Sequence, residues 1–233
     1  RVLTLLASAD PASAATYGHA VRPLFRALRS TGSLSLLAGG CSGLMGSSEP
    51  FCARGALGTT CNVYNGYWRH DLTATRREDC ADYCESRLHM KVHLLADAWL
   101  EEEVLSSGRS AGFGAAVLLL PGGIGTTREL FDVLQANLEF DAVPKPIFCL
   151  NVASCVDACR GFYDGVLEWL RQLFAERLLQ VHSGSPGTSL FISNDAAKLA
   201  AAIDEWAIAD KLPEDMRFET LFNISTASAS GRG

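Results

Sequence analysis

The chain has 233 residues, of which 48% are hydrophobic and 20% are charged, as is usual for a soluble globular protein with a substantial core. This length favours one large domain. The net charge of −6 argues against a nucleic-acid-binding protein, and no apolar run of about eighteen residues predicts a transmembrane helix. We therefore expect a cytoplasmic protein with neither nucleic acid nor a membrane as a partner.

Short apolar runs alternate with segments whose apolar residues recur at helical spacing. In chain order the predicted elements are strand 2–7, helix 17–28, strand 34–38, helix 47–57, strand 59–64, helix 94–105, strand 115–120, helix 127–140, strand 146–150, helix 155–179, strand 190–193 and helix 195–209. This alternation predicts an α/β fold with a doubly wound parallel sheet. We expect a single domain over residues 1–223 and a disordered tail over 224–233.

Eight cysteines are present, and we interpret them as free thiols in a reducing compartment. They are Cys41, Cys52, Cys61, Cys80, Cys84, Cys149, Cys155 and Cys159. Two pairs have the spacing i, i+4, which would allow a zinc site in principle. Structural zinc sites favour a Cys-x-x-Cys knuckle, which is absent, so we expect buried helical thiols and no metal.

Small residues follow three of the predicted strands, at Ser8-Ala9, Gly39–Gly43 and Pro121–Gly125. In an open parallel sheet, ligands bind outside the carboxyl ends of the strands. The turn at 121–126 runs directly into a helix, so its N–H groups and the helix dipole converge, and Thr126 and Thr127 add hydroxyl groups. We predict that a phosphate binds the N–H groups of Gly123 to Thr126. The alternative is a tight turn without a ligand.

Two common nucleotide-binding motifs are not present. The glycine spacing differs from the dinucleotide pattern G-x-G-x-x-G, and no Walker sequence occurs. Neither NAD nor P-loop ATP chemistry is indicated.

Glu129 is the carboxylate nearest to this turn in the sequence. It lies three residues after Thr126, as in a capping box, where the two side chains would satisfy N–H groups at the helix start. The functional alternative places the Glu129 carboxylate in the same crevice as the phosphate. Both interpretations remain open at this point.

The residues from Pro121 to Glu129 (PGGIGTTRE) match the P-G-G-x-G-T-x-x-E signature of the LONELY GUY proteins. These are cytokinin riboside 5′-monophosphate phosphoribohydrolases, often labelled as lysine decarboxylases. Gly39–Gly46 resembles the upstream G-G-x-x-x-G-L-M-G element of the family, one spacing residue short. Lys145-Pro146 with Leu150-Asn151 resembles its K-P…L-N strand. The resemblance extends from residue 1 to about 210.

The resemblance implies a Rossmann-like fold and a homodimer with the site near the interface. It also implies hydrolysis of the N-glycosidic bond of a nucleoside 5′-monophosphate, without a metal or organic cofactor. Glu129 and Arg109 are the implied catalytic residues. The candidate substrate-binding residues are Ser8, Gly40, Gly43, Met45, Gly122, Gly123, Gly125, Thr126 and Thr127.

The chain departs from the family in the segment before the turn. Family members carry an Arg-Lys pair there, and the Arg is catalytic. Here Glu101-Glu102-Glu103 makes the segment acidic, and Arg109 is its only basic residue. Either Arg109 substitutes, or Arg87 or Lys91 reaches the site, or catalysis is impaired. A catalytically silent nucleotide-binding protein is therefore the alternative function.

Overall fold

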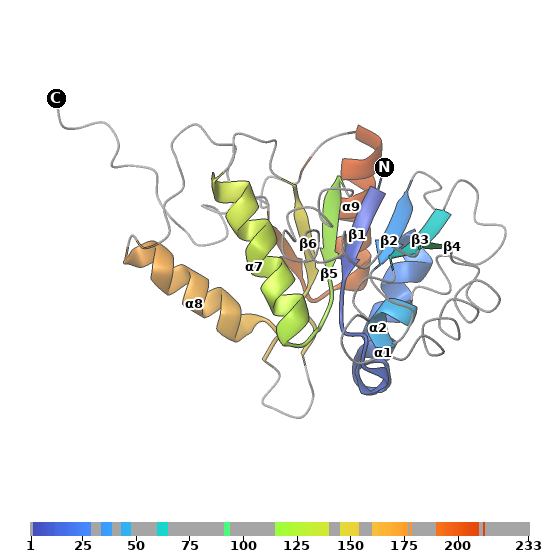
Figure 1. The fold of residues 1–233 in the computed structure, drawn as a ribbon, viewed down its shortest axis with the longest axis horizontal. Coiled ribbons are helices and arrows are strands. Elements are labelled where there is room, and N and C mark those ends of the chain that lie inside the picture. Colours follow the sequence, from blue (N-terminus) through green and yellow to red (C-terminus); the bar gives the residue numbers. More distant parts are fainter. Residues whose placement is uncertain are drawn as a thin grey trace.

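A seven-stranded, all-parallel sheet forms the centre of the protein (Figure 1). The computed structural model describes residues 2–28, 34–38, 43–47, 60–64, 91–93, 115–139, 145–153, 160–176, 178, 190–209 and 212. The strands are β1 (Val2–Leu6), β2 (Ser35–Ala38), β3 (Thr60–Tyr64), β4 (Lys91–His93), β5 (Ala116–Leu119), β6 (Ile147–Leu150) and β7 (Leu190–Ser193), in the spatial order β4-β3-β2-β1-β5-β6-β7.

Helices cover both faces of this sheet because successive side chains of a strand point to opposite faces. On one face, Leu118 of β5 and Phe148 of β6 pack in a cluster with α1 (Pro11–Leu28), α2 (Gly43–Gly46) and α9 (Ala196–Ala209). On the other face, their neighbours Val117 and Cys149 pack with α7 (Ile124–Glu139) and α8 (Asp164–Ala175). The predicted α/β, Rossmann-like, doubly wound parallel sheet is confirmed.

The direction in which successive strands are added to the sheet reverses at β1. From β1 the chain builds outward to β4 on one side, and β5 then returns to pair with β1 on the other, with Leu5 of β1 level with Leu118 of β5. A crevice forms at such a switch point, outside the carboxyl ends of the two strands. The turn at 121–126 therefore follows the strand at which a ligand is most expected.

Several helix boundaries differ from the sequence predictions. Helix α1 begins at Pro11, six residues early, because the Asp10 carboxylate accepts a hydrogen bond from the Ala12 N–H (2.9 Å) and Pro11 suits a first helical position. Helix α8 begins at Asp164 instead of Cys155, since residues 161–163 form a bridge and a turn. A helical turn at Gly43–Gly46 and the short strand β4 were not predicted.

Other expectations fall partly or wholly outside the described residues. These are the helix at 94–105, most of the helix at 47–57, the tail at 224–233, and the cysteines at 41, 52, 80, 84, 155 and 159. Cys149 is a free thiol buried in β6. None of the helices in the described part of the chain is long and apolar enough to cross a membrane.

Candidate functional site

The turn after β5 presents backbone N–H groups at the start of α7 that have no hydrogen-bond partner among the described residues. The first hydrogen bond of the helix joins the Thr127 N–H to the Gly123 carbonyl (3.0 Å), and the Thr127 hydroxyl donates to the same oxygen (3.1 Å). Gly123 is thus the N-cap, and the N–H groups of residues 123–126 precede the first helical bond. A helix of 16 residues places the positive end of its dipole at these groups.

This assignment corrects one prediction. Because α7 begins at Ile124, Thr126 lies in the first turn of the helix and cannot be its N-cap. The capping box between Thr126 and Glu129 is therefore wrong. The Thr126 side chain is instead buried against Gly122, where an added Cβ would collide with it. Glu129 lies in the second helical turn and is left without a capping role.

Four glycines of the site differ in the space that surrounds them. An added Cβ at Gly123 or Gly125 would meet no atom within 4 Å, so these two positions face open space. An added Cβ at Gly43, which has a φ of 60°, would lie 2.5 Å from the Ser8 carbonyl oxygen. Gly43 and Gly122 thus permit close packing, whereas Gly123 and Gly125 leave room for a ligand.

Ser8 connects the two glycine-rich segments. Its N–H donates to the Pro121 carbonyl (3.2 Å), and its own carbonyl accepts from the N–H groups of Leu44 (2.9 Å) and Met45 (3.4 Å). The Ser8 hydroxyl accepts from the Asp10 N–H. The structure therefore brings Ser8, Gly43 and the 121–126 turn together at the carboxyl edge of the sheet. The Met45 side chain is buried in the core, so its backbone alone faces this junction.

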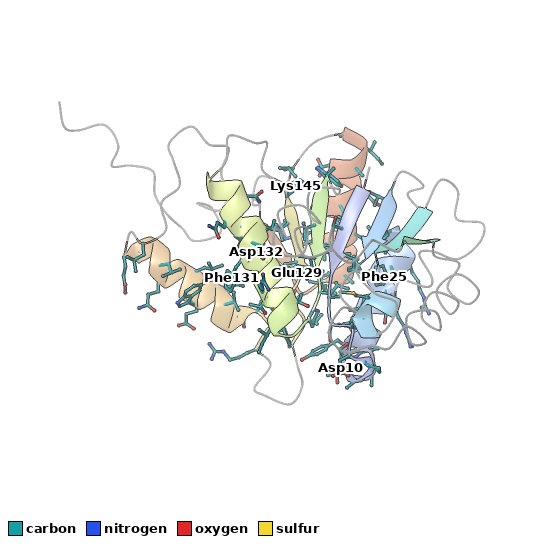
Figure 2. All side chains as sticks on the ribbon, viewed as in Figure 1. Asp10, Phe25, Glu129, Phe131, Asp132 and Lys145 are labelled. Carbon is teal, nitrogen blue, oxygen red and sulfur yellow. The ribbon has the colours of Figure 1, made fainter. Side chains whose placement is uncertain are left out.

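Glu129 is a carboxylate beside the turn (Figure 2). It is buried, with only 5% of its surface exposed. Burial, with a smaller contribution from the nearby Asp132 charge, raises the pKa of the Glu129 carboxyl to about 8. Within the described residues no hydrogen bond or ion pair holds this carboxylate. A carboxyl group whose pKa lies near neutrality is suited to proton transfer.

The remaining predicted residues are only partly placed. Gly40, Arg87 and Arg109 lie outside the described residues. Lys91 begins β4 and is level with Val117 across the sheet, four strands from β5. At about 4.8 Å per strand the two backbones lie roughly 19 Å apart within one chain. The alternatives in which Arg109, Arg87 or Lys91 supplies the basic group stay predictions.

Two residues of the site region were not singled out as functional by the sequence. The Tyr163 hydroxyl donates to the Leu120 carbonyl (2.7 Å), immediately before the turn. Asn151, noted only for its resemblance to a family motif, accepts from the Tyr163 N–H (2.7 Å). Gly161 followed by Asp164 is the sequence signal for the turn that places them, because the Asp164 carboxylate accepts from the Gly161 N–H (2.8 Å).

A polar cavity of about 550 Å³ lies nearby, at the carboxyl ends of β6 and β7. Asn151, Asp164, Ser193 and Lys198 contribute to its lining. It lies on the same edge of the sheet as the 121–126 turn. Asn151 belongs both to this lining and to the contacts of Tyr163.

Buried Glu129 gives a prediction for stability. Its folded pKa of about 8 lies above the unfolded value of 4.5, so the folded protein binds the extra proton between these values. The contribution of Glu129 to the free energy of unfolding is therefore largest below pH 4.5, and it is lost as the pH rises through 8. Glu129→Gln removes this loss, so we expect the variant to gain up to a few kcal/mol over wild type at pH 8.5, at ~1.4 kcal/mol per pKa unit, and little at pH 5.

Urea unfolding at the two pH values measures this effect. Glu205→Gln on α9 is the control, because Glu205 is exposed. An equal change in unfolding free energy at pH 5 and pH 8.5 for Glu129→Gln would contradict the buried, protonated state.

Residues 111–203 match the family model described as "Possible lysine decarboxylase". The matched region contains the 121–126 turn, α7, β6 and α8. It supports the lysine decarboxylase-like grouping expected from the P-G-G-x-G-T-x-x-E signature. No curated protein matches the chain.

Proposed function

We propose that the protein hydrolyses the N-glycosidic bond of a nucleoside 5′-monophosphate of the purine or cytokinin type, releasing free base and ribose 5-phosphate. The observation that carries this proposal is the combination of free N–H groups at residues 123–126 with the buried carboxylate of Glu129 one helical turn further on. A phosphate on the N–H groups anchors the sugar. With the phosphate held there, the C1′ atom of the ribose lies beside the Glu129 carboxylate.

The proposed role of Glu129 follows from the positive charge that develops on the ribose during cleavage. As the bond between C1′ and the base nitrogen breaks, its electron pair leaves with the base and positive charge builds on the ribose, as in glycosidases. Ionised Glu129 stabilises this charge and accepts a proton from the water that attacks C1′, while the departing base takes up a proton from solvent. We propose Arg109, in the acidic segment before the turn, as the second catalytic residue.

A pyridoxal-type decarboxylase fits these residues poorly. Such an enzyme needs a lysine that forms a Schiff base beside the phosphate site of the cofactor. Burial lowers the pKa of Lys145, as such a lysine would require, but Lys145 precedes β6 and lies at the amino end of the sheet (Figure 2). Lys198 lies over the Phe191 ring of β7, two strands from β5.

Incubation with AMP and with an N6-modified AMP, followed by detection of free base, tests the function. Release of base and ribose 5-phosphate in equal amounts supports it. Binding of AMP without release favours the silent nucleotide-binding protein, as the acidic residues 101–103 would suggest. We also propose a homodimer, which light scattering of the purified protein tests.

The phosphate position has its own prediction. Gly125→Ala adds a methyl group in open space and improves helix propensity, so the unfolding free energy should stay equal or rise by up to about 1 kcal/mol. We expect AMP affinity to fall about tenfold, because the methyl group enters the space assigned to the phosphate. Calorimetry with AMP and urea unfolding measure both effects. Unchanged AMP affinity would place the phosphate elsewhere.

A further inference from the structure

Tyr163 is a buried tyrosine whose hydroxyl has one specific partner. Its side chain is 1% exposed, and the hydroxyl donates to the Leu120 carbonyl at 2.7 Å. Burying a phenol hydroxyl costs free energy unless it is hydrogen-bonded, whereas phenylalanine would fill the same space without that requirement. The hydroxyl therefore points to a role for its contact with Leu120.

The backbone of Tyr163 is fastened to the end of β6. Its N–H donates to the Asn151 side-chain oxygen (2.7 Å), and the Asn151 amide donates to the Asp164 carboxylate (2.7 Å). The Phe162 N–H donates to the Val152 carbonyl (3.0 Å). An added Cβ at Gly161 would collide with Asn151, so the segment fits closely over this strand end.

These contacts hold the start of the 121–126 turn from one side, and β1 holds it from the other. Leu120 receives the Tyr163 hydroxyl, and the next residue, Pro121, receives the Ser8 N–H. The segments that follow the two neighbouring strands, β1 and β6, thus fix consecutive carbonyl groups immediately before Gly122. Tyr163 also packs in the same cluster as Leu130, which follows Glu129 on α7.

We propose that Tyr163, held by Asn151, is a positioning residue that aligns the 121–126 turn for phosphate binding. The nature of the ligand rests on the proposed function. Tyr163 acts through the Leu120 carbonyl and touches no substrate. Its loss should weaken interactions made by the phosphate and leave those made by the rest of the nucleotide unchanged.

Tyr163→Phe tests this role, with AMP and adenosine as paired probes. Calorimetry should show AMP binding weakened about tenfold, because the Leu120 carbonyl loses its partner and the turn loses its alignment. Adenosine, which lacks the phosphate, should bind as it does to wild type. Tyr17→Phe is the matched control: Tyr17 belongs to the same aromatic cluster through Phe162 (ring centroids 5.6 Å apart) and lies on α1.

The outcomes separate the inference from the reaction. AMP affinity within twofold of wild type in Tyr163→Phe, or equal weakening of AMP and adenosine, overturns the positioning role. Base release by wild type is scored separately, so a protein that binds AMP without cleaving it overturns the reaction only. A wild type that binds AMP no more tightly than adenosine overturns both. If Tyr163→Phe does not fold, Asn151→Ser takes its place, because the shorter serine side chain weakens the hydrogen bond that holds the Tyr163 N–H. The affinities of this variant for AMP and adenosine are then compared in the same way.

Discussion

Glu129→Gln should lower the turnover of AMP by a hundredfold or more while AMP still binds. Glutamine has nearly the same shape, but it carries no negative charge where positive charge develops on the ribose, and it cannot accept the proton of the attacking water. Loss of one preorganised electrostatic group commonly costs about 10² to 10³ in turnover. Steady-state kinetics of base release, with AMP affinity from calorimetry, measures the two effects separately.

The pH profile gives an independent check on the same carboxylate. Because the ionised form is the active one in the proposed mechanism and burial raises the pKa of Glu129 to about 8, kcat/KM of wild type should rise with pH and level off above 8. Asp132→Asn is the matched variant, since removing the nearby charge should shift this rise to lower pH. Near-normal turnover in Glu129→Gln, or a rate that falls between pH 6 and 8, removes Glu129 from the catalytic role.

Gly43→Ala should destabilise the protein by about 2 to 5 kcal/mol. The φ of 60° is costly for any residue with a Cβ, by about 1 to 2 kcal/mol. The added methyl group would also meet the backbone of Ser8, Ala9 and Asp10, and crowding of this kind costs about 1 to 3 kcal/mol. Urea or thermal unfolding measures the loss.

Gly123→Ala is the control for this substitution. It makes the same chemical change at the other glycine-rich segment, where the added methyl group meets no atom within 4 Å. Its unfolding free energy should stay within about 1 kcal/mol of wild type. Equal destabilisation by the two substitutions would contradict the junction between Gly43 and Ser8.

Strand β5 was predictable because it is apolar and buried on both faces. Ala116–Leu119 contains no polar residue, and all four of its side chains are buried. Strand β4 was missed because Lys91-Val92-His93 is short and contains one apolar residue, so no pattern marks it. The start of α1 was missed because residues 11–16 are small and largely exposed, which leaves only the cap at Asp10 and Pro11 as a signal.

The site was predictable only where a local motif defines it. The turn at 121–126 was found from its glycines, and the structure places Ser8 and Gly43 beside it. The contact between Tyr163 and Leu120 spans 43 positions of sequence, so it depends on how β5 and β6 pair. The burial of Glu129 likewise depends on the packing of α7, because a charged residue is rarely buried without a partner.

The small bridge between Ala153 and Gly161 has a consequence for how this protein can change. With Phe162 N–H bonded to Val152, the chain leaves β6 and returns at almost the same point. Lengthening the chain between these two points therefore adds a closure entropy of roughly 0.6 kcal/mol for each doubling of its length. Evolution can thus vary the length of the chain between Ala153 and Arg160, or an engineer can insert a peptide tag there, while Tyr163 keeps its position.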